Sequence, residues 1–233
     1  MATDFSSKNL VKTYAEGVIA EELALKPVIL KLVGNTKNKR VLDLGCGDGR
    51  YSIIFAKQGA KVIAIDVSEQ QLNIAKKINF HPNIKYIRSD ISRFSAISGN
   101  SIDLVFMNMV IPDLDNQKTL QKILSEVSRV LKKSGRFIFS TLHPLYLSPE
   151  QDISEKPTNF KKKNYFNEGS SYKASAITKF GNKIVFNETH FSLDYISKLI
   201  MKNNLVIKLL TESKQVPSKG IYLPKYIVIE CKK

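Results

Sequence analysis

The chain has 233 residues, 43% of them hydrophobic and 24% charged, a composition typical of a globular protein with one sizeable core. No apolar run approaches the roughly 20 residues that cross a bilayer, and the first residues carry no signal pattern, so we expect a cytoplasmic protein. The formal charge of +15 comes mainly from scattered lysines, with six arginines, which favours a lysine-rich surface and leaves a nucleic-acid partner as the alternative. The two cysteines and three histidines have no metal-ligand spacing, so we expect no metal.

Hydrophobic spacing predicts helices and strands that alternate along the first 144 residues. Two amphipathic helices are expected between Lys8 and Val33, the second starting at Pro27. Next come predicted strands at 39–45, 61–67, 84–90, 102–109 and 136–144, and predicted helices at 50–59, 69–78 and 115–135, the last stopping at Gly135. This alternation predicts an α/β fold with a doubly wound, parallel sheet.

The pattern changes after Pro144. A long irregular stretch at 145–167 precedes a predicted hairpin that turns at Gly181 and Asn182. A capped helix at 192–204 and two closing strands at 205–212 and 225–233 complete the chain. We expect a single domain, made of the segments 1–38 (an amino-terminal helical cap), 39–142 (a cofactor-binding core), 143–191 (a lid-like insert over the substrate) and 192–233 (the closing helix and strand pair).

The segment VLDLGCGDGRYS, at 41–52, predicts a nucleotide-binding turn between a strand and a helix. Glycines at alternate positions, Gly45, Gly47 and Gly49, allow a backbone to approach a ligand. Arg50 stands where the dinucleotide-binding pattern requires its last glycine, and the lysine of a P-loop is absent. The turn therefore indicates a nucleotide-like ligand that is neither a dinucleotide nor a P-loop triphosphate.

Acidic residues on either side of the turn narrow the choice of ligand. Asp66 ends the second predicted strand about twenty residues beyond the turn, where a carboxylate accepts from both ribose hydroxyls. Asp43 directly precedes the glycines and would repel a pyrophosphate. It suits a cofactor with an ammonium or sulfonium charge.

Five segments in order then resemble the successive motifs of class I S-adenosylmethionine-dependent methyltransferases: VLDLGCGDGR, VIAIDVSEQQL, YIRSDI, IDLVFMNMV and EVSRVLKKSGRFIFSTLHP. The resemblance covers 41–144 and implies a seven-stranded sheet with an antiparallel last strand, S-adenosylmethionine as cofactor and S-adenosylhomocysteine as product. It implies that Asp43, Gly45, Cys46 and Gly47 contact the methionine part of the cofactor and that Asp66 and Val67 contact the ribose. It also implies that Asp90 and Ile91 contact the adenine and that Asn108 and Met109 lie at the methyl-donor side. Asp90 as a turn residue and Asn108 as a satisfied polar residue at the sheet edge are the structural alternatives.

The acceptor is less well defined by the sequence. The segment NMVIPDL lacks the Pro-Pro-aromatic pattern of base-amino methylases, which argues against methylation of exocyclic amines on nucleic acids. His143, which ends the fifth predicted strand, is the candidate base, or it orders the following loop. Further candidates for acceptor contacts are Tyr14, Asp113, Tyr146, Tyr165 and His190. The alternatives are that Tyr14 covers the sheet, that Asp113 caps a turn, and that His190 has a structural role before the helix cap, which is the favoured interpretation for His190. The insert also offers Phe166, Tyr172 and Phe180 for an apolar pocket or for hairpin packing.

The sequence therefore predicts a methyltransferase that acts at oxygen or nitrogen of a small molecule. A methyltransferase acting on RNA or the ribosome is the alternative within the enzyme class. A non-catalytic regulator that binds S-adenosylmethionine is the alternative outside it.

Overall fold

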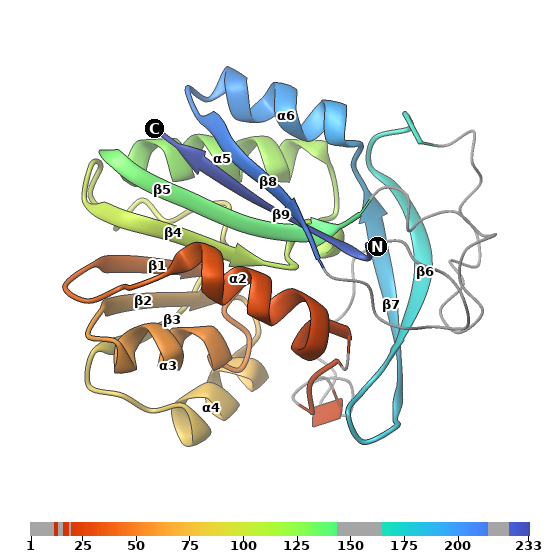
Figure 1. The fold of residues 1–233 in the computed structure, drawn as a ribbon, viewed down its shortest axis with the longest axis horizontal. Coiled ribbons are helices and arrows are strands. Elements are labelled where there is room, and N and C mark those ends of the chain that lie inside the picture. The colour runs from red at the N-terminus through yellow and green to blue at the C-terminus, as the bar shows by residue number, and fades with distance from the viewer. Residues whose placement is uncertain (1–11, 14–15, 19, 144–164, 214–223) are drawn as a thin grey trace.

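The computed structural model describes residues 12–13, 16–18, 20–143, 165–213 and 224–233. They form a central seven-stranded sheet, helices on both of its faces and a separate two-stranded hairpin (Figure 1). The helices are the π-helix η1 (Glu21–Leu25), α2 (Lys26–Val33), α3 (Arg50–Lys57), α4 (Glu69–Ile78), the 3-10 helix η2 (Ile111–Asp113), α5 (Gln117–Val130) and α6 (Leu193–Lys202). The strands are β1 (Arg40–Leu44), β2 (Lys61–Asp66), β3 (Ile84–Arg88), β4 (Ile102–Asn108), β5 (Leu131–Leu142), β6 (Ser170–Ile177), β7 (Lys183–His190), β8 (Val206–Glu212) and β9 (Tyr226–Lys232).

The sheet has the order β3-β2-β1-β4-β5-β9-β8. The first five strands in this order are parallel, and β9 runs antiparallel between β5 and β8. The predicted doubly wound sheet with an inserted antiparallel last strand is thereby confirmed. Strands β2 and β3 lie on one side of β1, whereas β4 and β5 lie on the other, so the strand order reverses between β1 and β4. Sheets of this kind bind their ligands at the carboxyl ends of the strands at this switch point.

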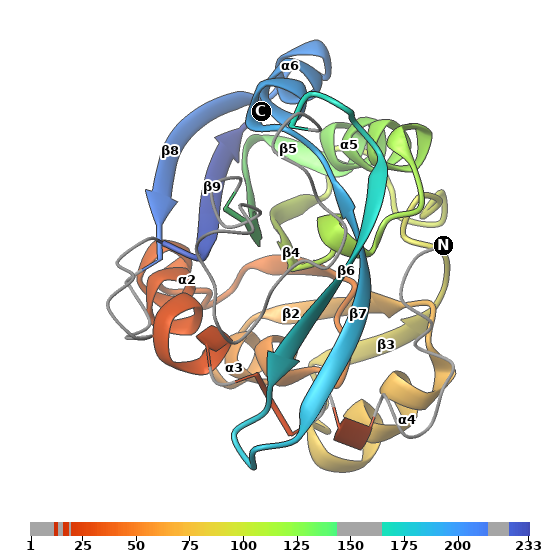
Figure 2. The same cartoon turned by 90° about the vertical axis from the view of Figure 1, so that its right-hand side faces the viewer.

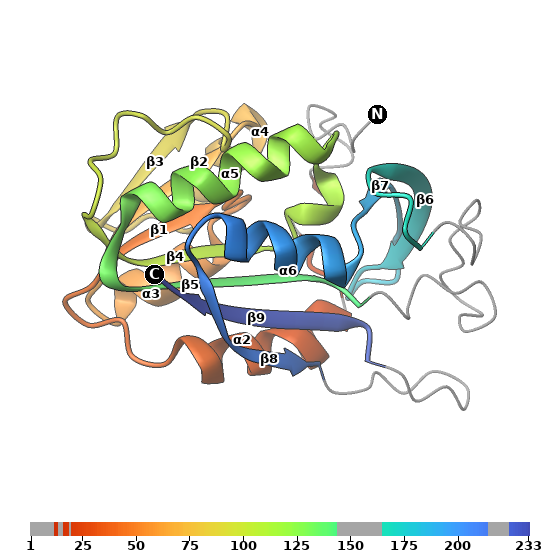
Figure 3. The ribbon, with the colours of Figure 1, turned by 90° about the horizontal axis from the view of Figure 1, so that it is seen from above.

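The two faces of the sheet bury separate apolar clusters. Side chains alternate along β1, so Leu42 and Leu44 join the cluster under α5 and α6 while Val41 joins the cluster under α2, α3 and α4. Figure 3 shows α5 and α6 above the sheet and α2 below it. No helix in the described residues has the length and apolar content needed to span a membrane.

The longest helix ends earlier than the sequence predicted. α5 stops at Val130 and β5 begins at Leu131, so the predicted helical end at Gly135 is wrong. Leu131 is buried and pairs with Ile102 of β4, and this tertiary pairing outweighs the helical preference of the lysines that follow. A Cβ on Gly135 would lie 2.9 Å from the carbonyl oxygen of Lys132, so glycine is needed inside the strand.

The amino-terminal prediction also needs a correction. Residues 20–33 form one continuous helical run, so Pro27 does not start a separate helix. Pro27 has no N–H to donate to the preceding turn. The π-helix directly before it, in which the N–H of Lys26 donates to the carbonyl of Glu21, widens that turn and lets the run continue.

The hairpin β6–β7 crosses in front of the carboxyl ends of the parallel strands (Figure 2). At its turn, Thr178 pairs with Val18 and its hydroxyl donates to Glu16 at 2.7 Å. At its other end, the side chain of Gln117 donates to the carbonyl of Glu168 at 2.9 Å. The hairpin is therefore fixed at both ends over the edge where a ligand is expected.

Candidate cofactor and acceptor site

The glycine-rich turn is tied to the neighbouring strand. The N–H groups of Gly45 and Cys46 both donate to the carbonyl of Ile65, at 2.8 and 3.0 Å. The N–H of Gly47 donates to Oδ2 of Asp66 at 2.8 Å. The turn and the end of β2 therefore form one unit at the carboxyl edge.

Two of the glycines are required by the backbone. Gly45 has φ +66°, and a Cβ there would lie 2.4 Å from Cγ2 of Val110. Gly49 has φ +77°, and its Cβ would lie 2.4 Å from the hydroxyl oxygen of Tyr86. Both positions combine a left-handed conformation with a close contact, and only glycine tolerates the two together.

The third glycine lies beside an unpartnered acceptor. A Cβ on Gly47 would come no closer than 3.9 Å to any neighbour, the nearest being Oε1 of Gln71. Ser68 caps α4, because its side chain accepts the N–H of Gln71, and its own N–H donates to Asp66 rather than to the Gln71 side chain. Within the described residues Oε1 of Gln71 is buried without a hydrogen-bond partner. An unpartnered acceptor next to an open glycine fits the ammonium or hydroxyl group of a ligand.

Asp66 can accept further hydrogen bonds. Its Oδ2 accepts the N–H of Gly47 and its Oδ1 accepts the N–H of Ser68, both at 2.8 Å. Burial raises the pKa of Asp66, and hydrogen bonds from the backbone of Ser68, Gly47 and Val67 oppose that shift. A carboxylate has roughly four acceptor positions, so Asp66 retains acceptor capacity for a ribose hydroxyl. The neighbouring side chain of Val67 is 65% exposed, an apolar surface that suits a purine ring.

Asp43 makes the base of the turn negative. Its carboxylate is buried and accepts from the hydroxyl of Ser52 at 2.6 Å. The pKa of Asp43 is raised to about 7, mainly by burial; the Ser52 hydrogen bond opposes the shift, and the carboxylates of Asp66 and Asp48 contribute to it. A cationic ligand would relieve this cost, whereas a pyrophosphate would add to it.

Arg50 has a structural role at the place where the dinucleotide pattern requires glycine. Its guanidinium donates to both oxygens of Asp48, at 3.0 and 2.9 Å, and contacts Glu22 at 3.4 Å. Arg50 therefore links the turn to the amino-terminal helical run. The sequence showed the departure from the pattern but not this connection.

The remaining predicted cofactor residues follow β3 and β4. Asp90 is exposed and accepts the N–H of Ser92 at 2.7 Å, which makes it a turn residue whatever else it binds. Asn108 accepts from the hydroxyl of Ser140 at 2.8 Å, and the backbone of Met109, at φ +54°, also donates to Ser140. Ile91 is half-buried next to Asp90. Their contacts with a cofactor stay predictions.

The predicted histidines are both held by other residues. His143 directly follows β5, and its Nε2 lies 2.9 Å from Oε1 of Glu212 at the end of β8, the outermost strand on that side of the sheet. Nε2 of His190 lies 2.7 Å from the carbonyl of Tyr165, and burial lowers the pKa of His190. These contacts favour the structural alternative for His190. The catalytic role of His143 stays a prediction.

The aromatic side chains of the predicted insert differ in exposure. Phe166 and Phe180 are 76% and 70% exposed. Tyr172 is buried on the inner side of the hairpin, and Tyr165 packs against His190. Tyr14 and Tyr146 lie outside the described residues.

Sequence reasoning missed one group that the fold brings to this edge. Glu188 on β7 is buried and hydrogen-bonds to Tyr172, close to η2, which carries the predicted residue Asp113. Burial raises the pKa of Glu188 to about 7. Ile184, Phe186 and Glu188 occupy alternate positions of the predicted strand, so Glu188 shares one face with two apolar residues. This pattern could have indicated that the Glu188 carboxylate points inward.

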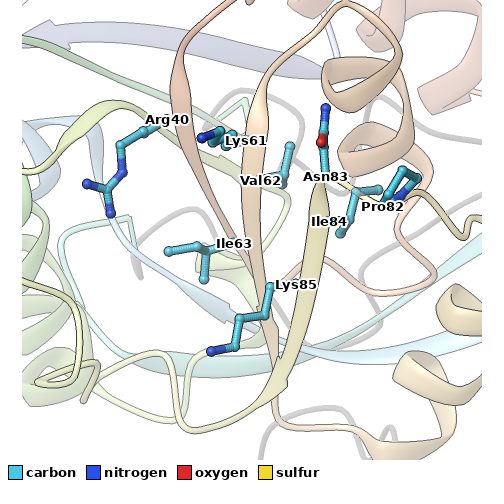
Figure 4. Close-up of a pocket in the computed structure, with 8 residues that line it drawn as sticks. All are labelled: Arg40, Lys61, Val62, Ile63, Pro82, Asn83, Ile84 and Lys85. Atoms are coloured by element: carbon cyan, nitrogen blue, oxygen red, sulfur yellow. The ribbon is translucent and has the colours of Figure 1, made fainter.

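A cavity of about 510 Å³ lies at the opposite, amino-terminal edge of the sheet (Figure 4). The segment between β3 and β4 contains no helix and leaves this part of the sheet face open. The cavity is lined by Arg40, Lys61, Val62, Ile63, Pro82, Asn83, Ile84 and Lys85. It contains none of the predicted site residues.

Comparisons with known proteins agree with this arrangement. Residues 35–204 match a family model described as a methyltransferase domain. The chain is 35% identical over 114 residues to a malonyl-[acyl-carrier protein] O-methyltransferase of Hamiltonella defensa, covering 49% of the chain and 42% of the relative. It is 27% identical over 167 residues to phosphoethanolamine N-methyltransferase 1 of Triticum aestivum, covering 66% of the chain and 33% of the relative.

One solved structure matches over nearly its whole length. A candidate S-adenosylmethionine-dependent methyltransferase from Listeria monocytogenes superposes with a TM-score of 0.69 at 27% identity, covering 89% of this chain and 96% of the other. The chain spans about half or less of the length of the curated relatives it matches. The chain belongs to the methyltransferase domain family, with the class I fold and S-adenosylmethionine as its methyl donor.

Proposed function

We propose that the chain transfers a methyl group from S-adenosylmethionine to an oxygen or nitrogen atom of a small-molecule acceptor. One observation carries this proposal: an open, acid-lined glycine turn lies at the sheet's switch point, underneath a fixed hairpin. Such a turn suits a cationic donor. The hairpin above it limits the size of the acceptor.

The donor supplies a methyl group on a positively charged sulfur. Asp66 retains acceptor capacity for the ribose, and Val67 offers an apolar surface to the adenine. Oε1 of Gln71 accepts from the ammonium of the methionine part beside Gly47. Asp43 stabilises the positive charge of the donor through its own negative charge.

The hairpin orients the acceptor and excludes water. Its inner face carries apolar side chains that pack with the sheet edge: Ala176, Ile184 and Phe186 lie in one cluster with Tyr51 and Phe106. In-line displacement depends chiefly on orientation and on a water-poor site. These apolar side chains can orient a compact acceptor and keep water away from it.

Relatives support a small acceptor without identifying it. Two of them are named for the small acceptors phosphoethanolamine and arsenite, whereas a third is named for malonyl-[acyl-carrier protein], an acceptor group carried on a protein. The basic cavity of Figure 4 lies at the edge away from the turn, so a nucleic acid held there would not present a base to the donor. The acceptor class is therefore proposed as a small molecule.

Incubation with donor carrying a labelled methyl group tests the proposal. We expect label in members of a metabolite panel of amines, phenols and carboxylic acids, and none in bulk RNA. The Asp66→Ala variant should lose at least about tenfold in initial rate at limiting donor, because ribose hydrogen bonds are removed. Label that enters only RNA would contradict the small-molecule proposal.

A further inference from the structure

Two polar side chains face each other on the inner side of the hairpin. Tyr172 of β6 lies directly opposite Glu188 of β7, and the tyrosine hydroxyl hydrogen-bonds to the carboxylate. Along β7, Ile184, Phe186 and Glu188 alternate with more exposed residues and share one face. Ile184 and Phe186 pack into the cluster that contains Tyr51 of α3. Glu188 therefore faces the carboxyl edge of the sheet, which the hairpin covers (Figure 2).

Glu188 carries an oxygen that lacks a partner. The residue is 8% exposed, and among the described residues its Oε2 is buried without a hydrogen bond, so Tyr172 binds Oε1. The hydroxyl oxygen of Ser170, two residues before Tyr172 on β6, is buried and unpartnered as well. A buried carboxylate oxygen without a donor costs free energy, so its presence calls for a ligand or a function.

The charges around this pair are negative. Glu21 of η1 raises the pKa of Glu188, and Asp113 of η2 and Glu188 raise the pKa of Tyr172. In the described part of the chain no basic side chain contributes to the pKa shift of Glu188. The missing donor is thus best supplied by a cation that bears N–H groups.

We propose that Glu188, oriented by Tyr172, binds the amino group of an amine acceptor and takes its proton before methyl transfer. This inference rests on the proposed function and names the acceptor class: a primary or secondary amine with a compact apolar body. The ammonium N–H donates to Oε2, and Phe186 and Ile184 contact the apolar part. Oε2 has no surface open to water, so the side chains around it must move for the acceptor to reach it.

The step balances in atoms and charge. A proton passes from the bound ammonium to the Glu188 carboxylate, leaving a neutral amine and a neutral carboxyl. The nitrogen lone pair forms the new bond to the methyl carbon while the carbon–sulfur bond breaks, and both electrons of that bond stay on sulfur. The positive charge of the donor ends on the N-methylammonium product. Glu188 returns its proton to solvent when the product leaves.

Calorimetric titration of the full chain with S-adenosylhomocysteine bound tests this role without turnover. The probes are benzylamine and hexylamine, each against its matched alcohol, at about pH 8, where Glu188 is ionised. We expect the wild type to bind the amines at least about tenfold more tightly than the alcohols. Glu188→Gln should remove this preference and leave the binding of S-adenosylhomocysteine unchanged.

Two further variants separate a binding role from a structural one. Asp194→Asn removes an exposed carboxylate on α6, paired only with Lys198 among the described residues, and should retain the amine preference. Tyr172→Phe should weaken the preference for amines over alcohols less than Glu188→Gln does. Thermal unfolding of each variant checks the fold, and Glu188→Gln should unfold at no lower temperature than the wild type, because it removes a buried charge.

The outcomes distinguish the two proposals. Equal affinities for amine and alcohol in the wild type, or an amine preference that survives Glu188→Gln, overturn the inference and leave the proposed function intact. Failure of S-adenosylhomocysteine to bind the wild type contradicts the proposed function instead.

Discussion

Gly45 shows how a single residue shapes the cofactor turn. Its φ of +66° and the 2.4 Å that would separate a Cβ from Cγ2 of Val110 both forbid a side chain. Gly45→Ala should lower the free energy of unfolding by about 3 kcal/mol, the sum of backbone strain and overpacking. Gly181→Ala is the control, because it has φ +83° and no neighbour within 4 Å, and it should cost only about 1 kcal/mol. Urea unfolding measures both, and equal costs would contradict the proposed contact.

Asp43 predicts a pH dependence of stability. Its pKa is about 7 in the folded chain against an ordinary value of 3.8, so the folded state holds the proton more tightly. Its contribution therefore makes the protein less stable as pH rises from about 4 to about 7, by on the order of 4 kcal/mol. Asp43→Asn does not titrate, so its stability relative to the wild type should increase across this window. Urea unfolding near pH 5 and near pH 8 tests this, and a constant difference would refute it.

Arg50 links two elements, the start of α3 and the amino-terminal helical run. Its side chain and that of Asp48 are largely buried, so Arg50→Met leaves carboxylates without their cation. We expect a loss of about 3 kcal/mol in the free energy of unfolding. Arg88→Met breaks an exposed pair with Glu69 and should cost less than about 1 kcal/mol. Denaturant unfolding of the two variants compares them, and similar losses would show that Arg50 makes no such link.

The elements were predictable from the sequence where local and tertiary preferences agree. Strands β1 to β4 are short apolar runs that end at a turn or an acid, and Ser68 and Ser192 cap α4 and α6 through their own side chains. The end of α5 was not predictable, because the pairing of Leu131 with β4 is tertiary. The candidate site divides in the same way. The turn and Asp66 follow from motif spacing, whereas the Tyr172–Glu188 pair depends on how the hairpin crosses the sheet.

The charge of the whole molecule bears on the RNA alternative. The net charge is +15, and cations line the cavity at the edge away from the glycine turn. We expect bulk RNA to bind at low salt and to be released by about 200 mM salt, as a purely electrostatic contact is. Binding of S-adenosylhomocysteine should not change when RNA is present. Filter binding over a salt series measures the first effect, and RNA binding that persists at high salt would favour a nucleic-acid substrate.

The acid-lined turn at the β1–β4 switch point holds the methyl donor in this view of the molecule, and calorimetric titration tests that assignment most directly. S-adenosylmethionine is titrated into the wild type, Asp66→Asn and Asp194→Asn. We predict binding of one donor per chain, an affinity at least about tenfold lower in Asp66→Asn, and no change in Asp194→Asn. Wild-type affinity in Asp66→Asn, or no binding by the folded wild type, would contradict the assignment.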